Sequence, residues 1–118
     1  MLIGELAQKT GLSKDTIRFY EKLGLVAPSQ RKAENGYKQY DEMTVNRLVL
    51  IKQAKDLGFT LSEINEAIND WQDGKLTQTE KMQILQTKVK QVEEKIQQLN
   101  NIKSYLMTKL DKVQEGIV

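Results

Sequence analysis

The side chains best able to do chemistry lie between residues 13 and 40 of this 118-residue sequence. A predicted helix there presents Lys14, Arg18 and Phe19 outward, with Thr16 in its first turn. Cationic and hydroxyl side chains on such a face can bind phosphates or reach the edges of nucleic-acid bases. The plainer interpretation is a solvated helix face, and these residues alone leave both interpretations open.

Two short helices are needed to position these side chains. The apolar residues Ile3, Leu6 and Ala7 recur at helical spacing and predict the first helix over about residues 4 to 10. Gly11 suits the left-handed position after its end, and Ser13 suits the N-cap of the second helix. The second helix, closed by Gly24, has three inward positions: Leu12, Ile17 and Tyr20. This pattern predicts a helix-turn-helix, whose second member normally enters the major groove of DNA.

A basic hairpin is predicted after the second helix. Its strands are expected near residues 25–29 and 37–40, with Pro28 tolerated on an edge strand and Asn35-Gly36 as the turn. Strands of this length are not stable alone, so they must pack on the helices as a wing. The wing carries three cations, which are Arg31, Lys32 and Lys38. A basic wing after a helix-turn-helix favours DNA binding over a merely solvated surface.

The charge of the sequence is unevenly distributed, although the formal net charge is only +2. From Lys9 to Lys55, ten basic residues accompany five acidic ones, a local charge of +5. From residue 59 onward, eight lysines accompany nine acids. The positive potential is therefore concentrated where phosphates would be bound.

Several function classes are excluded by composition. The sequence has no histidine and no cysteine, so it offers no imidazole base, no thiol nucleophile and no soft metal ligand. We therefore expect no enzyme activity, no metal site and no cofactor. No apolar run approaches the roughly 18 residues of a membrane span, and the first residues do not resemble a secretion signal. We expect a cytoplasmic protein with no membrane partner.

Two further helices are expected after the wing. The third, over about residues 42 to 57, is capped by Asp41 and predicted to be the core helix through Val45, Leu48, Val49, Leu50, Ile51, Ala54 and Leu57. Its Lys52 and Lys55 form either a second, helical wing on DNA or a solvated pair. The fourth, over about residues 61 to 71, begins at a capping box of Thr60 and Glu63.

The last third of the sequence reads in heptads after a second capping box, Thr77 to Glu80. Nine of the ten a and d positions over residues 78 to 113 are apolar: Met82, Leu85, Val89, Val92, Ile96, Leu99, Leu106, Leu110 and Val113. The exception is Lys103 at an a position. A repeat sustained over more than four heptads predicts a coiled coil, and a small domain offers it no internal partner. We therefore expect a homodimer, with a DNA-binding domain at 1–75, a dimerisation helix at 76–113 and a tail at 114–118.

Two aromatic residues stay ambiguous. Trp71, the single tryptophan, lies near the junction of the two predicted domains. It either fills the space where two helices meet or forms an aromatic wall for a small effector. Tyr105 falls at a c position, where it is either exposed or in contact with the partner.

The motifs together carry a family resemblance. They are IGELA at 3–7, TGLS at 10–13, TIRFYE at 16–21, GL at 24–25, NGYKQY at 35–40 and LGFTLSEI at 57–64. In these motifs the sequence resembles the MerR family of bacterial transcription regulators, and in the last helix the likeness is to architecture only. The resemblance implies a mainly α fold, with a winged helix-turn-helix DNA-binding domain followed by a long dimerisation helix in an antiparallel coiled coil.

The resemblance also implies a mechanism. A homodimer binds a palindromic sequence in the spacer between the −35 and −10 promoter elements, then bends and untwists it so that RNA polymerase can use both elements. The implied recognition-helix contacts are Lys14, Thr16, Arg18 and Tyr20, and the implied wing contacts are Arg31, Asn35, Tyr37 and Lys38. The family usually carries arginine where Lys38 stands, and lysine keeps the charge but loses the bidentate fork. A phosphate contact tolerates that change better than a guanine contact.

Two questions stay open at this point. The metal- and thiol-sensing members of the family use cysteines near the end of the long helix, and this sequence has none, so the effector is not identified. The alternative function is a DNA-architectural or recombination accessory protein of the excisionase type. Promoter sites with an abnormal spacer would favour the regulator, and recombination sites would favour the accessory protein.

Overall fold

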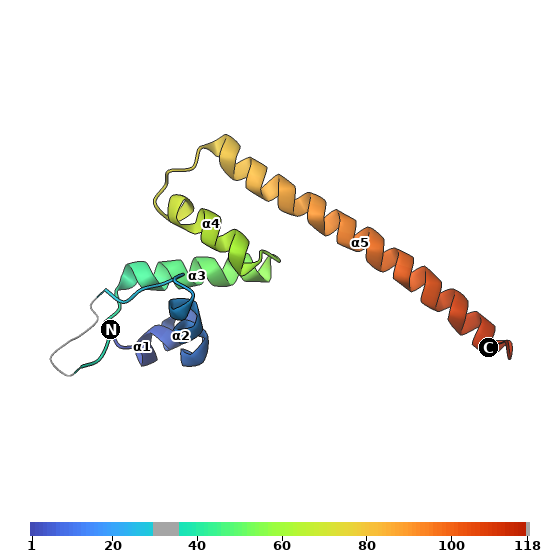
Figure 1. The fold of residues 1–118 in the computed structure, drawn as a ribbon, viewed down its shortest axis with the longest axis horizontal. Helices are drawn as coiled ribbons and strands as arrows, with labels where there is room; N and C mark the ends of the chain where they lie inside the picture. The colour runs from blue at the N-terminus through green and yellow to red at the C-terminus, as the bar shows by residue number, and fades with distance from the viewer. Residues whose placement is uncertain (30–35, 118) are drawn as a thin grey trace. The chain divides into compact units, whose positions relative to one another are not determined.

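The structure is a computed structural model that describes residues 1–29 and 36–117. It contains the helices α1 (Ile3–Thr10), α2 (Lys14–Lys22), α3 (Glu42–Asp56), α4 (Leu61–Gln72) and α5 (Gln78–Gln114) (Figure 1). The chain divides into two compact units, residues 1–75 with the first four helices and residues 76–118 with α5. The mainly α fold is confirmed.

The turn between α1 and α2 has the geometry that the sequence predicts. Gly11 has a φ of 71°, and its N–H donates to the Ala7 carbonyl at 2.9 Å. The Ser13 hydroxyl accepts from the Thr16 N–H at 3.1 Å and caps α2. A Cβ at Gly11 would lie 2.9 Å from the Lys52 ammonium, which can move aside as the end of a flexible side chain, so the turn needs glycine for its backbone angle and not for space.

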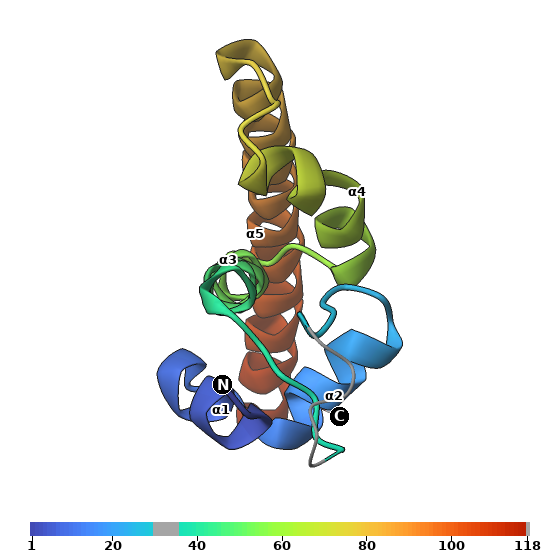
Figure 2. The ribbon, with the colours of Figure 1, turned by 90° about the vertical axis from the view of Figure 1, so that its left-hand side faces the viewer.

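The core of the first unit forms around one face of α3, which contacts both α1 and α4. Figure 2 looks along α3, with α1 and α2 below it and α4 beside it. The residues with the least exposure are Leu6, Ile17, Leu25, Leu48 and Ile51. The core therefore joins α1 and α2 to α3.

The core position of α3 is confirmed, but the prediction that all seven of its apolar residues lie in the core was wrong. Val49 and Leu57 were expected in the core, yet both are exposed, whereas Val45, Leu48 and Ile51 are buried. The reason is helical periodicity, because only residues three or four apart share the face that packs on α1 and α4. Leu57 lies past the last helical residue, where it caps the helix end.

The prediction of two regular wing strands was also wrong for the described residues, 25–29 and 36–40, which contain no strand. The N–H and the hydroxyl of Ser29 both donate to the Gln39 carbonyl, at 2.9 and 3.0 Å. The Tyr40 N–H instead donates to the Met1 carbonyl, and the Met1 ammonium donates to the Tyr40 carbonyl, both at 2.7 Å. Pro28 has no N–H to donate, which interrupts a regular ladder.

Both predicted capping boxes are confirmed. In α4 the Thr60 N–H donates to Glu63 at 2.9 Å, and the Glu63 N–H donates to the Thr60 hydroxyl at 3.1 Å. Thr77 and Glu80 repeat this arrangement at the start of α5, at 3.0 and 3.1 Å. The backbone N–H and the hydroxyl of Thr77 hold the pKa of the Glu80 carboxyl below its usual value.

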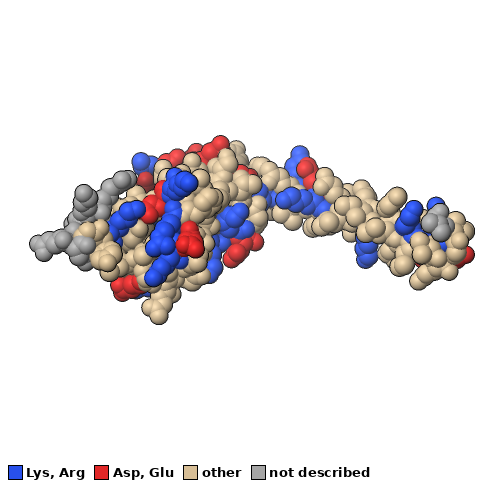
Figure 3. Space-filling model, turned by 60° about the horizontal axis from the view of Figure 1, so that its bottom comes forward, with Lys and Arg blue, Asp and Glu red and all other residues tan. Residues whose placement is uncertain are grey.

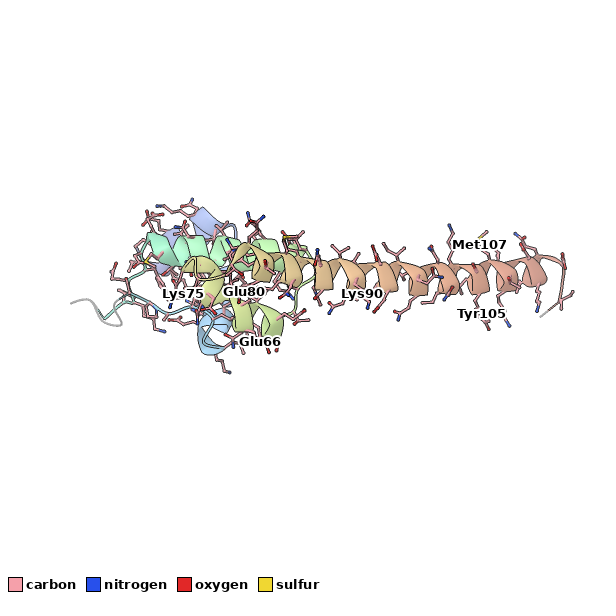
Figure 4. All side chains as sticks on the ribbon, turned by 90° about the horizontal axis from the view of Figure 1, so that it is seen from above. Glu66, Lys75, Glu80, Lys90, Tyr105 and Met107 are labelled. Atoms are coloured by element: carbon pink, nitrogen blue, oxygen red, sulfur yellow. The ribbon has the colours of Figure 1, made fainter. Side chains whose placement is uncertain are left out.

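Helix α5 has 37 residues, which corresponds to a length of about 56 Å at 1.5 Å per residue. Its nine apolar heptad residues, from Met82 to Val113, are between 42% and 64% exposed. A shallow groove of about 270 Å³ runs along them between Leu99 and Leu110. Figure 4 shows Tyr105 and Met107 projecting from opposite sides of the helix. Among the described helices, none combines the length and hydropathy required to span a bilayer.

The buried face of α3 gives a direct test of the core. Replacing the fully buried Leu48 in Leu48→Ala leaves a cavity against α1 and α4, and we expect a loss of about 2–5 kcal/mol in the free energy of unfolding. Val49→Ala removes its exposed neighbour and should cost about 1 kcal/mol or less. Urea unfolding at one fixed protein concentration measures both. Equal losses would contradict the assignment of the two faces.

Candidate nucleic-acid interface

A groove of about 1080 Å³ lies between α1, α2 and the chain that returns from the wing. Four cations line it, and they are Lys14, Arg18, Lys22 and Lys38. Tyr37 and Tyr40 also line it, as do Leu2, Ile3, Gly4, Glu5, Glu21 and Gly36. Lys and Arg side chains form a band across this part of the molecule, with acidic side chains beside it (Figure 3). The groove can therefore accept a polyanion if the carboxylates that line it are paired with groups of the protein.

Helix α2 presents the predicted recognition residues as expected, with one exception. Lys14, Arg18 and Phe19 are exposed, and Thr16 is half-buried in the first turn. The Arg18 guanidinium lies 3.4 Å from Asp15, in an exposed pair that competes only weakly with another partner.

The exception is Tyr20, for which the family resemblance implied a DNA contact whereas the helical pattern predicted an inward position. Its side chain is only 7% exposed and belongs to the hydrophobic core, with its ring centroid 6.2 Å from that of Phe19. The helical period turns Tyr20 to the same side as Ile17, toward the core. We therefore assign Tyr20 to packing and leave it out of the interface.

Glu21 connects α2 to the base of the wing. The Lys38 ammonium donates to one carboxylate oxygen at 3.2 Å, and the Tyr40 hydroxyl donates to the other at 3.3 Å. Burial, with the Glu21 carboxylate beside it, raises the pKa of Tyr40 to about 12. From the sequence, Glu21 was assigned no role, because no local pattern indicates this contact across seventeen residues.

Arg47 is a second residue whose role the sequence missed. Its Nε donates to the Leu25 carbonyl and its Nη1 to Gln72 at 3.1 Å, while Gln72 donates to the Met43 carbonyl at 3.1 Å. Burial lowers the pKa of the guanidinium, and Asp73 opposes this shift. Arg47 thus joins α3 to the chain after α2 and to the end of α4. The charge count from Lys9 to Lys55 had instead included it among the cations expected to bind phosphates. Its position beside the buried face of α3 was the available signal.

The other predicted contacts fall into three groups. Tyr37 and Lys38 are exposed at the groove, whereas Arg31, Lys32 and Asn35 lie outside the described residues. The Lys52 ammonium lies 3.5 Å from the Thr10 carbonyl, at the C-terminus of α1, where a cation is favourable. Lys55 is exposed, so its role in a helical wing stays a prediction.

Comparison with protein families identifies the family to which the chain belongs. The model for the MerR HTH family regulatory protein matches residues 1–71, and that for MerR, DNA binding, matches residues 45–109. The chain belongs to the MerR family. It is therefore a MerR-family transcriptional regulator with a DNA-binding domain.

Individual MerR-family proteins show how far the likeness extends. The mercuric resistance operon regulatory protein of Bacillus cereus is 42% identical over 107 residues, which are 89% of this chain and 79% of that protein. The lead(II) complex of PbrR691 from Ralstonia metallidurans CH34 is 31% identical with a TM-score of 0.80, covering 92% and 84% of the two chains. HiNmlR, a family regulator lacking the sensor domain and bound to promoter DNA, is 27% identical with a TM-score of 0.62, covering 97% and 86%. These relatives are regulators of transcription.

The burial of Tyr40, together with its contact with Glu21, predicts an unusual alkaline titration. Because the neutral phenol is favoured, its contribution to stability is complete below pH 10 and is lost as the pH rises towards 12. Absorbance of the phenolate should show one of the four tyrosines titrating near 12, and Tyr40→Phe should remove that step. Glu21→Gln should lower the pKa of Tyr40, and Tyr105→Phe should leave the high step in place. A high step that persists in Tyr40→Phe would assign it to another tyrosine.

Proposed function

We propose that this MerR-family regulator binds a palindromic promoter spacer as a homodimer and distorts that DNA for RNA polymerase. The observation that carries the proposal is the cationic groove between α2 and the base of the wing. Lys14 and Arg18 on α2 provide base and phosphate contacts, and Lys38 provides a phosphate contact beside them. The likeness to HiNmlR, which was solved on promoter DNA, supports the same use of this surface.

The homodimer is supported by the exposed seam of α5. Nine apolar side chains at heptad spacing are exposed in the single chain, and burying them against a second copy is favourable at about 25 cal/mol per Å² of apolar surface. Their number and regular spacing distinguish the seam from scattered exposed hydrophobic residues.

Lys103 supports an antiparallel orientation of the two helices. A parallel pair places both copies of Lys103 in one layer, where their charges repel. In an antiparallel pair centred between Ile96 and Leu99, every a residue faces a d residue, and Lys103 faces Val92 of the second copy. This register keeps all five pairs of layers and separates the two ammonium groups.

Distortion of the spacer follows from how such a dimer recognises DNA. Bending or untwisting a site of this length costs about 1–10 kcal/mol, depending on its sequence. Contacts from two recognition helices and two wings offset that cost, so the sequence is read partly through its deformability. Realigned promoter elements are then presented to RNA polymerase.

The composition of the chain limits which kinds of effector it can bind. These 118 residues contain neither cysteine nor histidine, so a thiolate or imidazole metal site cannot form within them, in contrast to what the names of the mercury and lead relatives suggest for those proteins. Trp71 lies in the last turns of α4 and is half-buried. An effector site at Trp71 stays a prediction, and the fluorescence of this tryptophan offers a direct readout for it.

DNA binding can be tested on duplexes selected from a random pool by the purified protein. Arg18→Ala should weaken binding by about 1–3 kcal/mol and relax the selected sequence, because it removes a base contact. Lys38→Ala should reduce the slope of log K against log salt concentration by about 1, because it removes a phosphate contact. Lys90→Ala on α5 is the matched control and should change neither. Unaltered binding in both groove variants would contradict the interface.

Dimerisation can be tested by sedimentation at micromolar concentration. Leu99→Asp places a charge in the central layer of the seam, so we expect a monomer that loses affinity for the selected duplex. Asn101→Asp adds a charge two residues away, at an f position on the opposite face, and should remain dimeric. A compact wild-type monomer that binds DNA with full affinity would refute this part of the proposal.

A further inference from the structure

An acidic side chain lies inside the basic groove. Glu21 projects from α2, and only 13% of its side chain is exposed, although four cations line the groove around it. A carboxylate removed from water costs free energy unless it is paired and hydrogen-bonded. The same negative charge also repels DNA phosphates that enter the groove. Its presence there therefore requires a specific role.

The two partners of Glu21 differ in their freedom to leave. Tyr40 is buried in the core, so its hydroxyl is fixed where it donates to Glu21 at 3.3 Å. The Lys38 side chain is 52% exposed, and its flexible stem brings the ammonium to within 3.2 Å of the carboxylate. An exposed lysine of this kind exchanges one anionic partner for another at low cost.

We propose that Glu21 is a positioning residue. In the free protein its carboxylate binds the Lys38 ammonium, which binds a DNA phosphate in the complex. When DNA enters the groove, the Lys38 ammonium leaves Glu21 for a phosphate oxygen, while Tyr40 keeps the carboxylate against the base of the wing. This inference rests on the proposed function, and it assigns to Glu21 a role in binding that requires no contact with DNA.

The exchange has a consequence for binding to any DNA. Each complex that uses Lys38 loses the ion pair with Glu21, so the net gain from that phosphate contact is smaller than for a free lysine. Glu21 thus weakens the sequence-independent, electrostatic part of binding. Less of the protein is then held on random DNA, where it cannot regulate.

A double-mutant cycle tests the exchange in the 118-residue chain. Wild type, E21Q, K38Q and the double variant are titrated with a fluorescent duplex of random sequence and with the selected duplex, at one fixed salt concentration. Glutamine is chosen because it matches glutamate in size and its amide oxygen still accepts from Tyr40. E42Q is the matched control, since Glu42 pairs with Lys9 at 2.8 Å on an exposed surface that does not line the groove.

We expect E21Q to tighten binding to the random duplex by about three- to tenfold when Lys38 is present. In the K38Q background the gain should be at least about threefold smaller, because no ion pair remains to be broken. E42Q should stay within about twofold of wild type. A loss of affinity in E21Q, which a purely structural role would produce, overturns the inference, and so does an equal gain in both backgrounds.

A second measurement uses the wild type and does not depend on the folding of E21Q. The NMR signal of the Glu21 side-chain carboxyl carbon should shift when DNA is added, and this shift should be lost in K38Q. An unchanged signal in the DNA complex overturns the exchange. If the wild type binds neither duplex, the proposed function falls as well, whereas wild-type binding without coupling between Glu21 and Lys38 overturns this inference alone.

Discussion

The candidate DNA-binding surface depends on the burial of a single face of α3. Helices α1 and α2 have eight and nine residues, lengths at which an isolated helix is marginal in water. They are stable because Leu6 and Ile17 pack in one core with Leu48 and Ile51 of α3. Arg47, beside that face, joins α3 to the chain after α2 through the Leu25 carbonyl. The position of every cation on α2 therefore follows from how α3 is packed.

Features with local causes could be predicted from the sequence. The turn at Gly11, the cap at Ser13 and both capping boxes depend on residues no more than four apart, so the residue types alone determine them. The wing strands could not be predicted in the same way. Whether they pair regularly depends on Pro28 and on the hydrogen bonds of Tyr40 with Met1, which lies 39 residues away in the sequence. Likewise, the exposure of Val49 depends on which sides of α3 have neighbours.

For the site, the sequence indicated the sign and location of the charge but not the partner of each charged group. Arg18 and Lys14 lie on the surface where the motif placed them. Arg47 and Lys52 carry the same charge, yet they bond to main-chain carbonyls and stabilise the domain. Glu21 was missed because its contacts with the wing cross seventeen and nineteen residues. A charge count treats all cations alike, whereas the tertiary neighbours of each cation decide whether it is exposed to a ligand or bonded within the protein.

The exposed seam of α5 has a consequence for how such a regulator responds to its own abundance. If two copies pair through Met82 to Val113 as proposed, the concentration of the DNA-binding species rises with the square of the chain concentration while monomers predominate. Low levels of synthesis then give almost no occupied promoter, and a modest increase gives a steep rise. A weaker layer at Lys103 raises the concentration at which this rise begins. In such a dimer the seam would set the chain concentration at which promoters become occupied, in addition to holding two copies together.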